Sequence, residues 1–138
     1  MTLDPERALV GAVFAHLRAD AALTDLLGSP PRIYDEPPPD PQHPFLTLGR
    51  SQAKPWGGVA GEGVEHALTL TVVSRFGGAE EARALTALVR AGVDDAALSL
   101  DGHRLVSLRV TFADVFRAAD WRSTYGVMRL RAVTEPLS

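Results

Sequence analysis

The feature that most constrains the fold is a change of hydrophobic period between residues 64 and 93. Residues 68–72 alternate leucine or valine with threonine, which is typical of a strand with one buried face. Across the Gly77-Gly78 pair the period lengthens, and apolar residues recur at helical spacing over residues 79–93. The sequence therefore predicts a strand that passes directly into an amphipathic helix.

The rest of the chain divides into shorter elements separated by glycine and proline. Asp4 and Pro5 suit the start of a helix, and an apolar stripe follows to Leu27, with a break expected near Asp20. Asp101-Gly102 is a two-residue hairpin signal, and residues 113–123 are expected to be irregular. The predicted elements are a helix over 5–27, strands over 32–35, over 45–49 and from 64 onward, a helix over 79–93, and strands over 98–100, 103–112 and 124–134.

These elements predict an α+β fold. Strands joined by hairpins, with two helices on one face, make a two-layer sandwich with a mainly antiparallel sheet in the order α-β-β-β-α-β-β. The length of 138 residues indicates a single domain over residues 1–138. Zero cysteines exclude disulfides and thiolate metal sites. The first residues lack the basic start and the apolar segment of a secretory signal peptide, and no apolar stretch approaches the ~20 residues needed to span a membrane. We therefore expect an intracellular soluble protein without membrane contact.

The two faces of the predicted sheet differ in polarity. Alternation places Val106, Leu108, Val110 and Phe112 toward the interior. The opposite face is expected to carry Thr69, Thr71, Ser107, Arg109, Thr111, Arg129 and Arg131. Residues 102–133 hold six arginines and two aspartates, a local balance of +4 in a chain of net charge −3. This basic region indicates either a surface for an acidic partner or passing DNA, or strand faces with ordinary charge pairs.

The segment from Arg50 to Gly63 is predicted as a long, glycine-rich connection between two strands. Connections of this length inside compact domains are usually functional or disordered. We expect it to be mobile in the free subunit, and its large Trp56 ring either folds back onto the sheet or docks into a partner. The expected interface residues are Lys54, Trp56, Gly57, Gly58 and Val59 in this segment, together with Arg109, Arg129 and Arg131 on the sheet.

The sequence offers no reagent for catalysis. Four histidines, His16, His43, His66 and His103, are dispersed over different elements without metal-ligand spacing. No serine lies in a Gly-x-Ser-x-Gly turn, and the paired carboxylates are adjacent at turns or helix starts, where capping explains them. We therefore expect no enzymatic activity, no metal and no cofactor.

The order and spacing of several segments resemble the phage and prophage family of tail completion, or tail terminator, proteins. The resemblance covers essentially the whole chain and rests on a pattern of spacing without a reactive residue. The segments that carry it are Leu9-Val10, residues 16–20, 32–35, 44–49 and 68–75, the Gly77-Gly78 pair, and residues 117–120 and 125–132.

The resemblance implies a structural protein of a long-tailed phage or a phage-like gene transfer agent. Such a protein would form a hexameric ring that closes the head-proximal end of the tail tube and joins it to the head connector. Its implied partners are further copies of itself, the major tail tube protein and a head-completion or connector protein, with DNA passing through non-specifically. The implied location is the neck of the particle, after assembly in the bacterial cytoplasm.

A different class of function stays open at this point. A small α+β binding module could use the glycine-rich loop with Trp56 to enclose a ligand or partner. The oligomeric state discriminates between the two, because a ring of six is not expected of a binding module.

Overall fold

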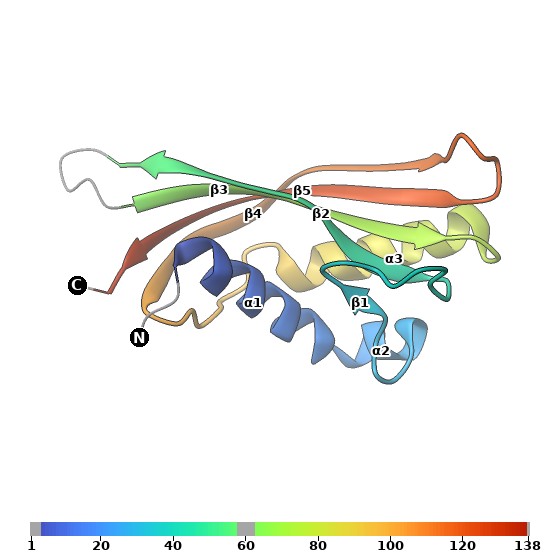
Figure 1. Ribbon diagram of the computed structural model, residues 1–138, viewed down its shortest axis with the longest axis horizontal. Coiled ribbons are helices and arrows are strands. Elements are labelled where there is room, and N and C mark those ends of the chain that lie inside the picture. The colour runs from blue at the N-terminus through green and yellow to red at the C-terminus, as the bar shows by residue number, and fades with distance from the viewer. Residues whose placement is uncertain (1–3, 58–62, 138) are drawn as a thin grey trace.

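The computed structural model describes residues 4–57 and 63–137 of the chain, which form two layers (Figure 1). A single long sheet makes one layer, and the helices lie along one face of it, below the strands in the view of Figure 1. The α+β class and the two-layer arrangement predicted from the sequence are therefore confirmed. The other face of the sheet carries no helix among the described residues.

Among the described residues, three helices, not two, pack against the sheet. The predicted break at Asp20 is confirmed and divides the first helix into α1 (Pro5–Arg18) and α2 (Ala21–Leu27). The Asp20 side chain accepts hydrogen bonds from the backbone N–H groups of Ala22 and Leu23, at 2.9 and 3.2 Å, so it caps a new helix. The third helix, α3, spans Gly78–Val93 as the change of period predicted.

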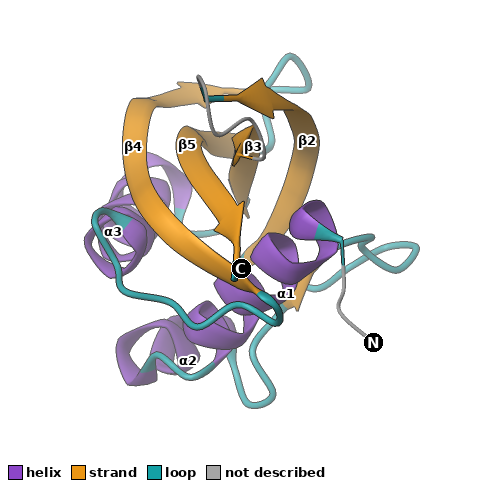
Figure 2. Cartoon of the chain, turned by 90° about the vertical axis from the view of Figure 1, so that its left-hand side faces the viewer, coloured by secondary structure: helices purple, strands orange, loops and turns teal. Residues whose placement is uncertain are grey.

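The sheet formed by residues 4–57 and 63–137 has five strands, in the order β1-β2-β3-β5-β4. The strands are β1 (Ile33–Tyr34), β2 (Phe45–Trp56), β3 (Gly63–Ser74), β4 (His103–Arg117) and β5 (Thr124–Pro136). The short β1 pairs in parallel with β2, and the other three pairings are antiparallel. Figure 2, an end-on view, shows β2 and β4 at the two margins of the sheet, with β3 and β5 between them.

The core lies between the sheet and the helices. Alternate residues of the two central strands point into the core. The residues buried there are Leu68, Leu70 and Val72 of β3, as the alternation over residues 68–72 predicts, and Met128, Leu130 and Ala132 of β5. Helix α3 contributes Leu85, Val89 and Val93, and α1 contributes Leu9, Val13 and Leu17. This burial of one face of the sheet leaves the polar side chains on the other face.

The predicted long connection between the second and third strands is wrong. Strand β2 continues through Arg50 to Trp56, and its register with β3 runs to the pair Trp56↔Gly63. A bulge between Leu48 and Arg50 shifts the register by one residue, which interrupts the alternation that a sequence reading follows. Residues 50–56 are therefore part of a ladder, and the expectation that this part is a mobile loop is wrong.

The predicted interior face of β4 is only partly correct. Leu108 is buried and Val110 is partly buried, but Val106 is 45% exposed and Phe112 is 43% exposed. Bulges between Leu105 and Ser107 and between Val110 and Phe112 each shift the face by one residue.

The ends of β4 also differ from the prediction. The strand continues to Arg117, so residues 113–117 are ordered in the sheet and only 118–123 form the turn. The expected strand over residues 98–100 is reduced to a single bridge, Leu100↔His103.

Candidate functional site

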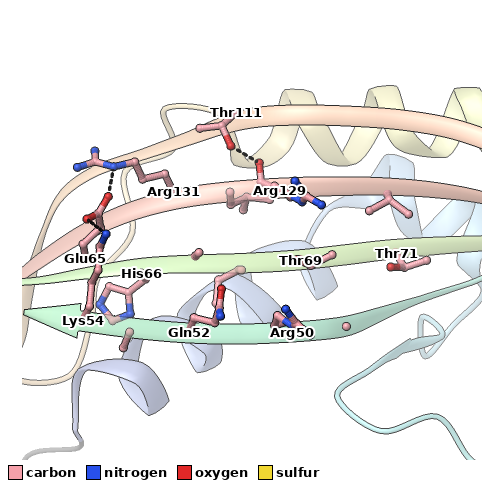
Figure 3. A pocket seen from close by; sticks show the side chains of 16 residues that line it. Arg50, Gln52, Lys54, Glu65, His66, Thr69, Thr71, Thr111, Arg129 and Arg131 are labelled. Carbon is pink, nitrogen blue, oxygen red and sulfur yellow. Dashed lines mark hydrogen bonds and ion pairs between the residues drawn. The ribbon is translucent and has the colours of Figure 1, made fainter.

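A groove runs along the open face of the sheet, on the side away from the helices (Figure 3). Its volume is about 1140 Å³. Strands β2, β3 and β5 supply nearly all of its walls, with Thr111 from β4. The polar side chains labelled along it are Arg50, Gln52, Lys54, Glu65, His66, Thr69, Thr71, Thr111, Arg129 and Arg131.

The groove forms because short side chains on the central strand lie between long side chains on its two neighbours. Ala67, Thr69 and Thr71 of the central strand β3 are short. Long side chains of both neighbouring strands flank them, because Arg50 and Arg129 lie opposite Thr69 on either side. Since alternate residues of a strand share a face, the row of short residues forms the floor of the groove and the arginines form its walls.

The groove is basic. Its one described carboxylate, Glu65, lies between two cations: the Lys54 Nζ is 3.4 Å away, and the Arg131 Nε donates to the other carboxylate oxygen. The hydrogen bond from Arg131 holds the pKa of Glu65 below its usual range. Arg50 and Arg129 have no carboxylate partner among the described residues, and the Arg129 guanidinium lies 4.9 Å from the Phe112 ring centroid. The net charge of the groove is therefore positive.

The structure brings together three of the interface residues expected from the sequence. Lys54, Arg129 and Arg131 line the groove. Trp56 ends β2 and is 40% exposed, and Gly57 follows with a φ of 115°, a conformation that favours glycine. Gly58 and Val59 lie outside the described residues.

Arg109 does not line the groove. Its Nε donates to the Asp94 Oδ1 at 3.1 Å, at the margin of the sheet where the chain leaves α3. The same oxygen accepts the backbone N–H of Val110 at 2.9 Å. That backbone hydrogen bond, followed by the one from Arg109, lowers the pKa of Asp94. The predicted cluster of sheet arginines is therefore split into two groove residues and one marginal ion pair.

Two exposed aromatic side chains were not expected from the sequence, one in the β4–β5 turn and one between β3 and α3. Trp121 is 76% exposed and has a φ of 60°. The Asp120 carboxylate fixes this turn by accepting the backbone N–H groups of Arg122 and Ser123 at 2.8 and 3.0 Å. Phe76, at the junction between β3 and α3, is 88% exposed. An aspartate placed three residues before a serine signals such a turn, but exposure cannot be read from the sequence.

His66 is a buried titratable group beside the groove. Its ring is fully buried, and its Nε2 lies 2.9 Å from the Thr134 hydroxyl, while its Nδ1 has no hydrogen-bond partner among the described residues. Burial lowers the pKa of His66, and Glu6 opposes this effect only in part. The folded protein therefore holds this imidazole neutral at pH values where an unfolded chain protonates it.

We predict that the melting temperature falls as the pH drops below about 6.5, the ordinary pKa of histidine. Below that value the unfolded chain binds a proton that folded His66 resists, so acid favours unfolding. His66→Gln should flatten this part of the profile, because glutamine binds no proton in this range. Melting curves between pH 5 and 8, roughly the range of histidine titration, test this. An unchanged slope in His66→Gln would contradict it.

The described residues do not assemble a metal site or a membrane span. Within residues 4–57 and 63–137, no group of three His, Asp or Glu side chains could hold a metal ion. No described helix is long and apolar enough to cross a membrane. The arrangement can bind acidic groups along the groove through its arginines, which suit carboxylates and phosphates.

Comparison with known proteins identifies the family. The family model described as tail completion protein gp17 matches residues 11–135. No curated protein matched the sequence. Among solved structures, a chain from the virion of a native gene transfer agent particle has the same fold, with a TM-score of 0.84 and 31% sequence identity. The match covers 94% of this chain and 96% of that one. The chain therefore belongs to the family of tail completion protein gp17 and is a structural protein of a phage or phage-like tail.

Proposed function

We propose that this protein forms a six-membered ring that closes the head-proximal end of a tail tube and connects it to the head. The observation that carries the proposal is the match of almost the entire chain to a chain of a gene transfer agent virion, at 31% identity and a TM-score of 0.84. A match without large insertions on either side supports the same kind of assembly in a particle. The partners would be the tail tube protein on one side and a head connector protein on the other.

The open face of the sheet suits the inside of such a ring. The groove residues Arg50, Arg129 and Arg131 are basic, and Arg50 and Arg129 have no ion pair among the described residues. Arginines on a surface attract the phosphate backbone of DNA without reading its sequence. We therefore place this face toward the passing genome and the helices toward the outside.

The alternative of a ligand-binding module loses the feature on which it depended. In that alternative the loop that encloses the ligand begins at Arg50, whereas residues 50–56 are paired with β3. The groove that they help to line lies on the sheet face that no described helix covers. An open basic groove fits an extended acidic surface better than an enclosed small molecule.

Removing the protein from particle-producing cells tests the proposal. We expect tails that are no longer limited at their head-proximal end, and heads without tails, because nothing caps the tube or connects it. Expression of the wild-type chain from a plasmid should restore complete particles. Complete particles in its absence, seen by electron microscopy, would contradict the proposal.

A further inference from the structure

The two margins of the sheet each have one open half. On the β2 margin, β1 covers only Leu46 and Thr47, and no described backbone group bonds to the outer side of residues 50–56. On the β4 margin, the chain after α3 covers the first half, because the Asp95 N–H donates to the Leu108 carbonyl and Asp94 accepts from Val110. No described backbone group bonds to the outer side of residues 111–117. Exposed strand edges of this kind are templates for another chain.

The open half of one margin lies level with the covered half of the other. Across the sheet, Arg50 is level with Thr69, Arg129 and Phe112. The open run of β2 extends from this row toward Trp56, and the open run of β4 extends from it in the opposite direction, toward Arg117. Strands β2 and β4 of one copy run antiparallel to each other. A second copy in the same orientation, shifted along the strand direction, can therefore place the open half of its β4 beside the open half of the first copy's β2.

In both open segments, alternate residues point their backbone N–H and C=O groups away from the sheet, as a strand pairing requires. The Leu46 N–H donates outward to Arg32 of the segment before β1, and the bulge after Leu48 moves the outward positions to Ser51, Ala53 and Pro55. The Val110 N–H also points outward. The bulge after Val110 moves the outward positions of β4 to Ala113, Val115 and Arg117.

The side-chain faces of these outward positions agree as well. Ser51 points to the helices, since its hydroxyl donates to Glu6 of α1 at 2.9 Å. Val115 lies opposite Gly126, which faces Thr86 of α3, so its side chain points to the helices too. In an antiparallel pair, residues that exchange hydrogen bonds have their side chains on the same face. The two runs can therefore join into one continuous sheet whose open faces lie on the same side.

We propose that residues 51–56 of one copy pair in an antiparallel way with residues 112–117 of the next copy. In this pairing Ala53 lies opposite Val115, and Lys54 lies opposite Asp114. The inference rests on the proposed ring and names the contact that builds it. The occupant of each open edge is a second copy of this chain.

Charge selects this register. Lys54 is 72% exposed at its side chain, and Asp114 is exposed and has no ion pair among the described residues. A shift by two residues in either direction, the smallest that preserves the hydrogen-bond pattern, would put Phe112 or Phe116 opposite Lys54 instead. Opposite charges directly across a ladder stabilise it.

The same register covers exposed aromatic side chains. Trp56, 40% exposed, comes to lie opposite Phe112, 43% exposed, and Gln52 opposite Phe116, 42% exposed. On the helix face, Arg117 comes to lie opposite Ser51, whose partner Glu6 can accept its guanidinium. Pro55 lacks an N–H, so its pair with Ala113 has one hydrogen bond, from Ala113 to the Pro55 carbonyl. The backbone hydrogen bonds of the contact therefore end at Pro55.

The shift between copies has the size that a closed ring needs. Within one copy Ser51 is level with Val110, through Leu68 and Leu130. In the contact it lies opposite Arg117, which pairs with Thr124, and Thr124 precedes Leu130 by six residues on β5. A shift of six residues corresponds to about 20 Å along the strands, and the four long strands of one copy are together about 19 Å wide. A ring in which every copy is shifted by this amount has its strands tilted by about 45° from the ring axis. Closed barrels have strand tilts of ~35–45°.

A disulfide tests this contact in the assembled particle. The chain has no cysteine, so Lys54→Cys combined with Asp114→Cys introduces its only thiols. Residues 54 and 114 would form a non-hydrogen-bonded pair with Cα atoms about 4.5 Å apart, within disulfide range. Inside one copy they lie on opposite margins of the sheet and cannot meet. After oxidation of purified particles, we expect a ladder of covalent multimers that ends at the ring, and that reductant converts to monomers.

The control places the second thiol on the covered half of β4. Lys54→Cys with Arg104→Cys has two comparably exposed positions, 72% and 64% at the native side chains, and should give monomers. Monomers from the Lys54–Asp114 variant, in particles whose tails are closed by a visible ring, would overturn the edge contact and leave the proposed ring intact. Absence of a ring would overturn the proposed function itself.

An exchange of charges tests the same residue pair without a disulfide. It replaces the cysteine test when the cysteine variant yields too few particles to analyse. Lys54→Glu and Asp114→Lys should each lower the yield of complete particles at least about tenfold, through a like-charge pair repeated at every contact. The double exchange should restore most of it, while the melting temperatures of all three stay close to that of the wild type. Folded single variants with normal yield, or no recovery in the double variant, would overturn the register.

Discussion

Replacing Leu70 or Leu108 by alanine should lower the free energy of unfolding by ~2–5 kcal/mol. Leu70 is fully buried in the central strand β3, and Leu108 is 1% exposed on β4 beneath the helices. Each truncation removes buried apolar surface and leaves a cavity that the surrounding side chains refill only in part. Thermal or denaturant unfolding of the purified variants measures the loss.

Val106→Ala is the matched control for Leu108. Simple alternation puts both residues on the interior face, but the bulge after Leu105 leaves Val106 45% exposed. Its truncation should cost less than ~1 kcal/mol, as for most surface positions. Losses below ~1 kcal/mol at both Leu70 and Leu108 would mean that the strand faces are assigned wrongly.

Gly126→Ala should destabilise the protein by ~1–3 kcal/mol, the usual range for overpacking. A Cβ on Gly126 of β5 would overlap the Thr86 hydroxyl of α3 and lie 3.5 Å from the Ala82 carbonyl oxygen. Helix α3 can approach the sheet here because residue 126 has no side chain. The change therefore separates helix from sheet, and unfolding measurements detect it.

A second substitution identifies the cause. Thr86→Ala removes the overlapping hydroxyl, which is buried and has no hydrogen-bond partner among the described residues, so alone it should cost little. The variant with both Gly126→Ala and Thr86→Ala should recover much of the lost stability, because the two effects share one contact. If the two losses simply add, the overlap is not the reason for the glycine.

The central strands and α3 could be predicted from the sequence because their periods are uninterrupted. Residues 68–72 alternate without a bulge, and the helical spacing after Gly78 is regular. The cap at Asp20 was also readable, since aspartate before an apolar stripe is a helix start. Wherever one face of an element is buried along its whole length, hydrophobic pattern and structure coincide.

The marginal strands could not be predicted in full. Bulges after Leu48, Leu105 and Val110 each shift the alternation by one residue. Residues 50–56 carry no apolar alternation, and all of them except Ser51 are exposed. The strand is held there by its ladder with β3, which composition does not reveal.

The candidate site was half predictable for the same reason. Arg129 and Arg131 alternate with buried residues on β5, so their shared face could be read directly. Arg50 and Gln52 lay in a segment interpreted as a loop, and Arg109 is drawn to Asp94 by a contact distant in sequence. Long-range pairing between strands decides which polar residues meet, and a single sequence does not contain that register.

A cryo-electron microscopy map of the complete particle tests the central claim most directly. The account predicts six copies of this chain in a closed ring between the tail tube and the head connector, with the helices outside and Arg129 and Arg131 toward the channel. A different number of copies, an open arrangement, or a position elsewhere in the particle would contradict it.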